Sequence, residues 1–183
     1  EGIQPGKDIR IRTISGHIGS ESTDDLASKW GAEQVFDWYG VGDTGLIAGQ
    51  GSDQSGMHMM EDAQFVELLD VDTHHPVAEG DVGDLVCTCL YKDDIYPVIR
   101  FQTQDLTRIL PGENPLDIPF RRMVGHMGRS DNMVKLRGVN VYPQGVGALL
   151  SAQFSETNGE YICLVAEDSG RTEMTVKVEV TNQ

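Results

Sequence analysis

Apolar side chains in the first fifty residues follow two different spacings along the chain. Residues 9–14 and residues 34–39 each predict a short strand. Between them, the segment from Ser22 to Asp25 is typical of a helix start, and Leu26 and Trp30, four apart, predict the buried stripe of that helix. A strand, a helix and a strand in this order predict a parallel sheet, whose ligands bind beyond the strand ends.

The middle of the chain changes to short strands separated by turn residues. Strands are predicted over residues 58–69, 83–90 and 98–109. Their spacing favours an antiparallel meander or a small barrel-like unit. Residues 49–56 are polar and rich in glycine, which predicts a flexible loop, and this loop lacks the lysine of a phosphate-binding loop.

The last third of the chain predicts a second, smaller unit. Residues 133–142 are typical of a hairpin with Arg137 and Gly138 at its turn, and residues 143–150 predict a weak helix. Residues 162–166 and 174–180 alternate as two further strands. The expected fold class is therefore α/β of the mixed α+β kind: a parallel-sheet unit with an antiparallel β subdomain, followed by a small α+β domain.

Composition narrows the range of partners. The chain has 29 acidic and 14 basic residues and a net charge of −15, which opposes binding to nucleic acid but not to a small nucleotide. It has neither a membrane-length apolar run nor a leader-like start, so a cytoplasmic protein is expected, and the first residue, which is not Met, suggests a cut boundary. Cys87, Cys89 and Cys163 are expected to be structural thiols in a reducing compartment. The histidines, among them His58 and His126, show no spacing typical of a metal site.

Three segments that follow one another along the chain carry residues suited to nucleotide chemistry. They are Asp37-Trp38-Tyr39-Gly40-Val41-Gly42-Asp43, Ile99-Arg100-Phe101-Gln102-Thr103-Gln104-Asp105-Leu106 and Gly128-Arg129-Ser130-Asp131-Asn132-Met133, and the third continues into Arg137-Gly138-Val139-Asn140-Val141-Tyr142-Pro143. Each segment alone is a weak signal. Together they resemble the core motifs of the phenylacetate-coenzyme A ligase branch of adenylate-forming enzymes, and the resemblance extends over nearly the entire chain.

This resemblance implies an enzyme that joins a carboxylic acid to ATP with Mg²⁺ and releases pyrophosphate. The acyl group then passes from the adenylate to coenzyme A after the small C-terminal domain rotates. Residues 1–128 would be the C-terminal part of the large AMP-binding domain, and residues 129–183 the hinge and a truncated small domain. The partners implied are an acid, of the aryl kind in this branch, with ATP and coenzyme A, and a homodimer is also suggested. Because an upstream phosphate loop and a downstream catalytic lysine are not recognised, these residues alone are expected to be inactive.

On the adenine side, the resemblance assigns cofactor-binding roles to Ser20, Glu21, Tyr39, Gly40 and Val41. The backbone at Ser20 and Glu21 would lie along the adenine, and the alternative there is a strand-to-helix turn with a cap. The Tyr39 ring can line the acyl or adenine pocket, and Gly40 permits close backbone approach. For these two residues the alternative is a core aromatic followed by a turn glycine.

On the phosphate and ribose side, the resemblance carries over to Asp43 and Asp105. Asp43 stands where the family has a glutamate that holds Mg²⁺, so it is the metal candidate and a catalytic candidate, although Gly42 before it replaces a hydroxyl residue. Gly42 keeps a cofactor-binding assignment. Asp105 matches the carboxylate that accepts hydrogen bonds from the ribose, with a surface ion pair to Arg108 as the alternative. Gln104 stands where the family favours glycine.

The third motif supplies the remaining candidates. Arg129 matches an arginine that reaches the ribose and the phosphates, and it is counted as both catalytic and cofactor-binding. Asp131 matches the hinge about which the small domain turns. By analogy, Lys135, as a catalytic residue, and Arg137 with Gly138, as cofactor-binding residues, would face the active site when the thioester forms. The alternatives are a solvated arginine, a simple turn and a hairpin with solvated basic residues.

Departures from the family pattern keep a second class of function open. The branch usually continues after Pro143 into a helix with paired acidic residues, but Gly147 and Ala148 occur here. Together with Gly42 and Asp43, they allow a non-catalytic nucleotide-binding or interaction protein, a degenerate relative of the ligases. A plain acidic β-rich binding domain would explain the composition but not three ordered motifs.

Overall fold

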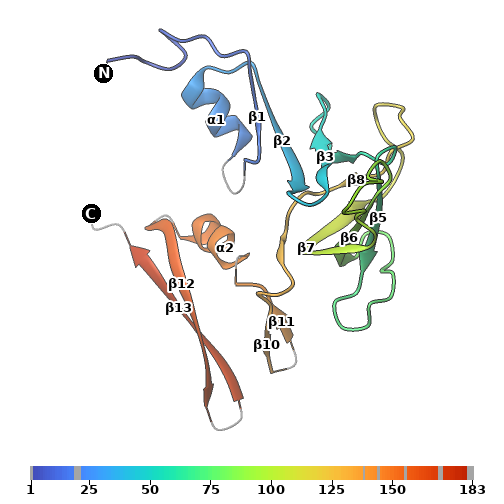
Figure 1. The fold of residues 1–183 in the computed structure, drawn as a ribbon. Coiled ribbons are helices and arrows are strands. Elements are labelled where there is room, and N and C mark those ends of the chain that lie inside the picture. Colours follow the sequence, from blue (N-terminus) through green and yellow to red (C-terminus); the bar gives the residue numbers. More distant parts are fainter. Residues whose placement is uncertain are drawn as a thin grey trace. The chain divides into compact units, whose positions relative to one another are not determined.

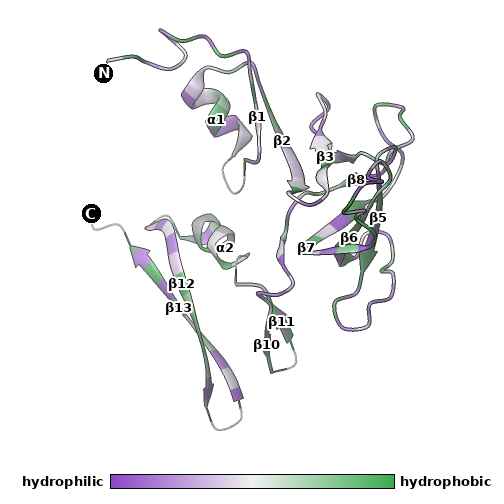
Figure 2. Cartoon of the chain, in the orientation of Figure 1, coloured by the Kyte–Doolittle hydropathy of each residue, from purple (hydrophilic) through white to green (hydrophobic). Residues whose placement is uncertain are grey.

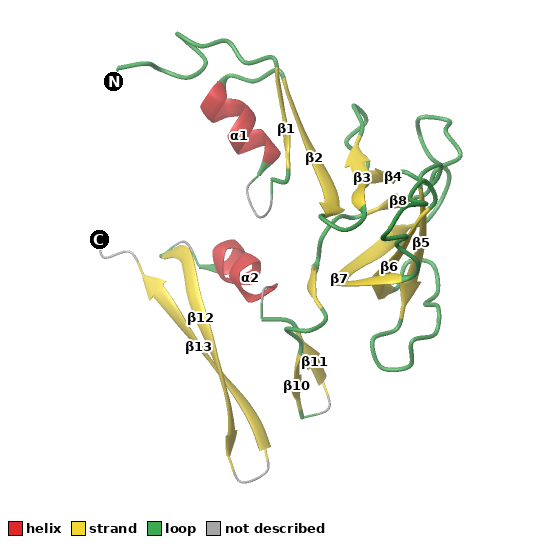
Figure 3. Ribbon diagram, viewed as in Figure 1, coloured by secondary structure: helices red, strands yellow, loops and turns green. Residues whose placement is uncertain are grey.

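The chain divides into two units, Glu1–His126 and Met127–Gln183, and Figure 1 labels most of their elements. The computed structural model describes residues 2–18, 22–137, 139–143, 145–154, 156–168 and 171–180. Strands form most of the secondary structure of both units, as Figure 3 shows. The mixed α+β class predicted from the sequence is confirmed.

One curled sheet organises the first unit, with strands in the order β1-β2-β3-β4-β8-β7-β6-β5. The strands are β1 (Thr13–Gly16), β2 (Gln34–Val41), β3 (Gly45–Gln50), β4 (Met57–Met59), β5 (Gln64–Leu69), β6 (Val82–Cys89), β7 (Phe101–Leu110) and β8 (Arg122–Met123). β1 and β2 pair in parallel, with Thr13 opposite Gln34, and α1 (Thr23–Trp30) connects them, which confirms the strand–helix–strand prediction. The remaining neighbours in this path pair antiparallel.

The helix α1 begins and ends where local chemistry predicts. The Ser22 side chain accepts a hydrogen bond from the Asp25 N–H at 3.3 Å, which satisfies one of the unpaired donors at the helix start. Gly31 ends the helix in the left-handed conformation, with φ of 60°. The predicted buried stripe is wrong, because no residue of α1 is buried and Trp30 is 41% exposed. Leu26, Ala27 and Trp30 make too narrow a stripe on this eight-residue helix to be closed off from solvent.

The core of the first unit is formed by side chains from the strands of this sheet, which carry many of the hydrophobic residues coloured in Figure 2. It contains Tyr39, Ile47, Ala48, Met57, Met59, Val66, Leu68, Leu85, Cys87 and Met123. The Gln64 side-chain amide on β5 donates to the Thr44 carbonyl beside β3 at 2.8 Å. Five inter-strand steps separate β3 from β5, which would place them about 24 Å apart in a flat sheet. The sheet therefore curls until its far end returns to β3, as expected of a barrel-like unit.

Several predicted boundaries are wrong. The strand expected over residues 9–14 begins only at Thr13, because Pro5 and Ile9 close a turn instead. The glycine-rich loop expected over residues 49–56 begins at Gly51, because β3 occupies Gly45–Gln50. The glycines and the alanine of β3 are poor strand formers. Hydrogen bonding to β2 on one side and to β4 on the other therefore determines the extended conformation of β3.

The second unit is built on two hairpins and a helix. Its elements are β9 (Gly128–Arg129), β10 (Val134–Leu136), β11 (Val139–Val141), α2 (Gly145–Gln153), β12 (Thr157–Asp168) and β13 (Arg171–Val180). β10 and β11 pair antiparallel next to Arg137, as predicted, and Arg137 has φ of 51° in the tight turn. β12 and β13 also pair antiparallel and are longer than expected. Neither α1 nor α2, the helices of the described part, has the length and apolar composition that crossing a membrane requires.

Gly147 has a packing role in the second unit. A Cβ added at Gly147 would lie 2.5 Å from Cε1 of the Tyr161 ring on β12, far inside van der Waals contact. The Tyr161 hydroxyl reaches past this point and donates to the Pro143 carbonyl at 3.0 Å. The ring therefore packs directly against the backbone of α2, which requires glycine at this position. At Gly145, the first residue of α2, an added Cβ would have no atom within 4 Å.

A pair of matched substitutions tests this packing. Gly147→Ala should lower the free energy of unfolding by about 1–3 kcal/mol, because Tyr161 must move. Gly145→Ala should be neutral or stabilise by up to about 1 kcal/mol, because alanine is the better helix former. Chemical denaturation of the full-length protein followed by tyrosine fluorescence measures both values. Equal effects of the two substitutions would contradict the packing described.

Candidate functional site

Tyr39 and Asp105 form the buried centre of the site in the first unit. Tyr39 on β2 is only 4% exposed, and its hydroxyl donates to Oδ2 of Asp105 at 2.7 Å. Burial raises the pKa of Tyr39 above its ordinary value, so the hydroxyl keeps its proton and remains a donor. Tyr39 is a core aromatic, as the alternative had it, and its polar end also holds the carboxylate.

A bulge in β7 turns Asp105 inward. Asp84 of β6 lies opposite Leu106 and Val86 lies opposite Gln102, so three residues of β7 span the interval that one residue of β6 covers. Gln104 in this interval has φ of 62°, a left-handed conformation that favours glycine. The extra residues bury Asp105, Leu106 and the next residue in succession, instead of alternating them. Asp105 is 8% exposed, so a surface ion pair does not describe it.

His126 is the residue of this cluster that the sequence did not indicate. Its Nε2 lies 3.4 Å from Oδ1 of Asp105, while Tyr39 contacts the other carboxylate oxygen. A charged or neutral imidazole N–H can donate to that oxygen. The Tyr39 hydroxyl thus orients one oxygen of this carboxylate, and the His126 ring lies close to the other. Spacing along the sequence could not show this, because His126 follows β8 and meets β7 only in the folded sheet.

The β2–β3 turn carries the metal candidate. Gly42 and Asp43 are exposed at its tip, whereas Thr44 beside them is fully buried. A Cβ added at Gly40 would lie 2.4 Å from the Gly45 carbonyl oxygen, so Gly40 is required by the approach of its own hairpin partner. This contact within the hairpin explains the glycine, and the close approach of a nucleotide to Gly40 stays a prediction.

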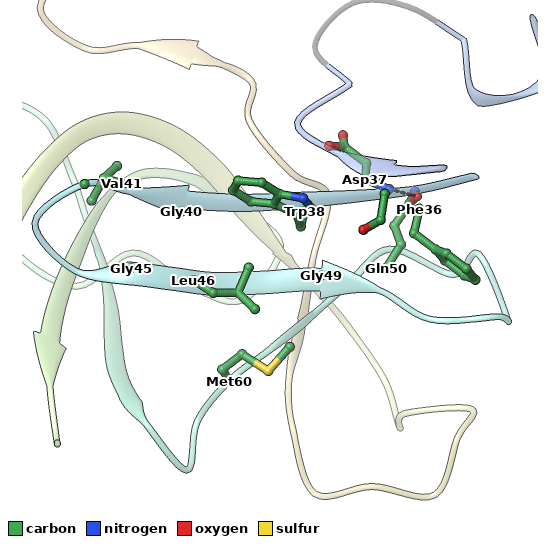
Figure 4. A pocket seen from close by; sticks show the side chains of 12 residues that line it. Phe36, Asp37, Trp38, Gly40, Val41, Gly45, Leu46, Gly49, Gln50 and Met60 are labelled. Atoms are coloured by element: carbon green, nitrogen blue, oxygen red, sulfur yellow. Dashed lines mark hydrogen bonds between the residues drawn. The ribbon is translucent and has the colours of Figure 1, made fainter. Parts of the chain in front are cut away.

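A pocket of about 710 Å³ lies beside this turn on β2 and β3, as Figure 4 shows. Its lining is mainly apolar and aromatic. The residues are Ser15, Phe36, Asp37, Trp38, Gly40, Val41, Gly42, Gly45, Leu46, Gly49, Gln50 and Met60. Asp37 ties its edge together, because its N–H donates to Oε1 of Gln50 at 2.8 Å and its carboxylate accepts from the Ile18 N–H at 3.0 Å.

In the second unit, Arg129 and Asp131 form a bidentate pair. Nε of Arg129 donates to Oδ1 of Asp131 at 2.9 Å and Nη2 donates to Oδ2 at 2.7 Å. The Arg129 guanidinium holds the pKa of the Asp131 carboxyl below its usual value, so the pair stays charged at neutral pH. Arg129 is thus paired with a carboxylate, although its side chain stays 39% exposed. Lys135 on β10 and Arg137 at the hairpin turn are both exposed.

Comparisons with known proteins show which proteins the chain is similar to. No family model matches the chain. Phenylacetate-coenzyme A ligase of Aromatoleum evansii is 38% identical over 127 residues, which are 69% of this chain and 28% of the relative. The Pseudomonas putida protein of that name is 36% identical over 155 residues, 78% of this chain and 33% of the relative. The chain thus spans about a third of the length of these relatives or less.

Solved structures agree with the sequence relatives. A 2-hydroxyisobutyryl-CoA ligase in the postadenylation state with an acyl-AMP, R3-HIB-AMP, superposes with a TM-score of 0.72 at 28% identity, over 87% of this chain and 34% of the ligase. The open conformation of that ligase with 2-HIB-AMP and CoA also gives 0.72, at 26% identity, over 95% of this chain and 39% of the ligase. In sequence and in fold, the chain is phenylacetate-coenzyme A ligase-like.

The residues described suit the ligands of such a ligase in part. Asp105 is an acceptor-only group held in place, the chemistry that ribose hydroxyl donors require. Among the described residues, no group of three or more His, Cys, Asp or Glu side chains could hold a metal ion. The exposed carboxylate of Asp43 nevertheless fits Mg²⁺, which proteins commonly bind through one or two carboxylates together with water and substrate phosphates. Ser20, Glu21 and Gly138 lie outside the described residues.

The left-handed conformation at Gln104 can be tested without any ligand. Gln104→Gly should leave the protein about 1 kcal/mol more stable than Gln104→Ala, because a Cβ is disfavoured at positive φ. Comparing two variants that both lack the amide removes any effect of the glutamine side chain. At Arg108, an exposed position of the same strand, the order should reverse, because glycine weakens an extended strand. Urea denaturation of the four variants decides, and alanine equal to glycine at position 104 would contradict the assignment.

Proposed function

We propose that the protein takes part in the ATP-dependent activation of a carboxylic acid and its transfer to coenzyme A. In the first step a carboxylate oxygen of the acid attacks the α-phosphorus of ATP, the bond to the β-phosphate oxygen breaks, and pyrophosphate leaves. In the second, the thiolate sulfur of coenzyme A attacks the acyl carbon and AMP leaves. These residues contribute chiefly by orienting substrates and by balancing charge.

The observation that carries the proposal is the buried carboxylate of Asp105, held by the Tyr39 hydroxyl at 2.7 Å. A carboxylate already oriented by the protein loses little freedom when ribose hydroxyl groups bind to it. The same carboxylate stands at the position that matches the ribose-binding residue of the ligases. Tyr39, Asp105 and His126 would therefore form the nucleoside side of the site.

Charge at the phosphates would be balanced by Arg129 and by a metal ion. Mg²⁺ bound at Asp43 would neutralise phosphate oxygens and align them. Arg129 is already a bidentate donor to Asp131, so its guanidinium plane is fixed before substrate binds. Asp131 would serve as the hinge, and Lys135 and Arg137 would meet the acyl-adenylate when the second step begins.

The pocket on β2 and β3 supports an apolar acid, of the aryl kind. Phe36, Trp38, Leu46 and Met60 line it, and Figure 4 shows the Trp38 ring lying along β2. Flat apolar walls favour an aromatic acyl group over a charged one, since burying a second charge would need a partner. The pocket also borders Gly40 and Gly42, next to the turn where activation would occur.

A non-catalytic nucleotide-binding protein remains the second candidate, and one observation favours it. A Cβ added at Gly42 would meet no atom within 4 Å, so packing does not require glycine in place of the family's hydroxyl residue. Gly147, by contrast, is required by Tyr161 and is therefore no sign of lost function. The second candidate thus rests on Gly42 and the shortened carboxylate of Asp43.

The cysteines bear on the compartment. Cys87, Cys89 and Cys163 are free thiols. Burial raises the pKa of the Cys87 thiol to about 12, with the neighbouring Cys89 adding to the effect, so it stays protonated and unreactive. Free thiols suit a reducing compartment, and we therefore place the protein in the cytoplasm.

Pyrophosphate exchange tests the first step. The full-length protein with Mg²⁺ should exchange labelled pyrophosphate into ATP only when a suitable acid, such as phenylacetate, is present. Asp105→Asn should raise the KM for ATP by about 10- to 100-fold, because the variant loses the charge that strengthens the ribose bonds. Asp81→Asn, at an exposed turn position, is the matched control and should change nothing. If the folded wild-type protein shows no pyrophosphate exchange with any of the acids tested, the non-catalytic candidate is favoured.

The acid pocket makes a separate prediction. Trp38→Ala should weaken binding of phenylacetate by about 10- to 100-fold in KM and improve the relative use of bulkier acids, since one wall of the pocket is removed. Trp30→Ala, which removes an exposed tryptophan from α1, should leave acid preference unchanged. Exchange rates over a panel of aryl and aliphatic acids provide the comparison. An unchanged preference in the Trp38 variant would place the acyl group elsewhere.

A further inference from the structure

The turn that carries Asp43 accepts hydrogen bonds from residues distant in the sequence. The Thr44 N–H donates to the Val41 carbonyl at 3.2 Å, which closes the turn between β2 and β3. Thr44 is fully buried while Gly42 and Asp43 are exposed, so the turn has an open tip and a buried base. Any group that fixes the base also fixes the direction in which the Asp43 carboxylate leaves the chain.

Three donors meet at one backbone oxygen in this base. The Thr44 carbonyl accepts from the Tyr91 hydroxyl at 2.7 Å, from Nε2 of Gln64 at 2.8 Å and from Sγ of Cys89 at 3.5 Å. A carbonyl has two lone pairs, which the two shorter bonds fill, and the thiol is a weak third donor. Gln64 is itself fixed, because Cys87 donates to its Oε1 at 3.1 Å.

Lys92, the residue after Tyr91, contacts the carbonyl of Asp43, one residue before Thr44. The donor is Nζ of Lys92. Lys92 and Tyr91 therefore bind the consecutive carbonyls of Asp43 and Thr44 in the turn. A Cβ added at Gly45 would lie 3.0 Å from the Tyr91 hydroxyl oxygen, and Gly45 has φ of 78°. The glycine therefore gives Tyr91 access to the turn. Tyr91 is 55% exposed, and its hydroxyl is the group that bonds to the turn.

We propose that Tyr91 and Lys92, in the connection between β6 and β7, are positioning residues that fix the Asp43 turn for its metal and phosphate ligands. This inference rests on the proposed function for the role of Asp43, but its contacts stand without it. The connection also leads directly into β7, which carries Asp105. One loop thereby links the phosphate side of the site to the ribose side.

A matched pair of tyrosines in this loop tests the proposal in the full-length protein. Tyr91→Phe removes only the hydroxyl that reaches Thr44, whereas Tyr96→Phe removes the hydroxyl of a tyrosine that is equally exposed, at 53%. Without nucleotide or metal, backbone amide hydrogen exchange over residues 42–45 should be about threefold to tenfold faster in Tyr91→Phe than in wild type. Tyr96→Phe should match wild type.

The second measurement is the Mg²⁺ concentration that gives half-maximal pyrophosphate exchange. Tyr91→Phe and Lys92→Met should each raise this Mg²⁺ concentration about threefold to tenfold, with a smaller change in KM for the acid. Lys92→Arg, which keeps a donor and the charge, should stay close to wild type. A merely structural role would alter stability without shifting the Mg²⁺ requirement. Faster hydrogen exchange with an unchanged Mg²⁺ requirement would therefore overturn the positioning role.

The two proposals can fail separately. If wild type shows no pyrophosphate exchange with any acid, the proposed function fails, and hydrogen exchange at residues 42–45 alone decides whether Tyr91 holds the turn. If wild type is active but Tyr91→Phe and Tyr96→Phe behave alike in both measurements, the positioning proposal fails while the proposed function stands.

Discussion

The hydrogen bond from Gln64 to the Thr44 carbonyl ties the far end of the sheet back to β3, and the candidate site depends on this closure. The bond is 2.8 Å long and joins a buried side chain of β5 to a backbone carbonyl next to β3, so it requires the sheet to curl. The same curl brings Tyr39 on β2 to Asp105 on β7, strands that would lie about 19 Å apart if the sheet were flat. Without closure, the carboxylate would lose the Tyr39 hydroxyl.

The cost of aiming Asp105 inward is concentrated at one bulge. Gln104 adopts a conformation that side chains with a Cβ disfavour, by about 1–2 kcal/mol, and the surrounding pairing of β6 with β7 must offset that amount. A regular strand would alternate, and Asp105 and Leu106 could not both be buried. A side chain in place of glycine at position 104 therefore makes the inward geometry of Asp105 more costly to form.

Three positions are occupied by glycine for different physical reasons. Gly40 is required because the Gly45 carbonyl approaches it, and Gly147 because the Tyr161 ring lies against it. Gly42 lies in open space, so its lack of a side chain is a chemical change rather than a packing requirement. Only the contacts around each glycine show whether packing requires it.

The sequence by itself determined the local features, because these depend on neighbouring residues. The cap at Ser22, the β1–α1–β2 unit and the β10–β11 hairpin follow from short-range patterns, and the ordered motifs identified the ligase-like family. Only the tertiary structure decided that Gly45–Gln50 is a strand and that His126 contacts Asp105. These features arise from pairing and side-chain contacts between residues far apart in the chain, for which local propensity and spacing carry no information.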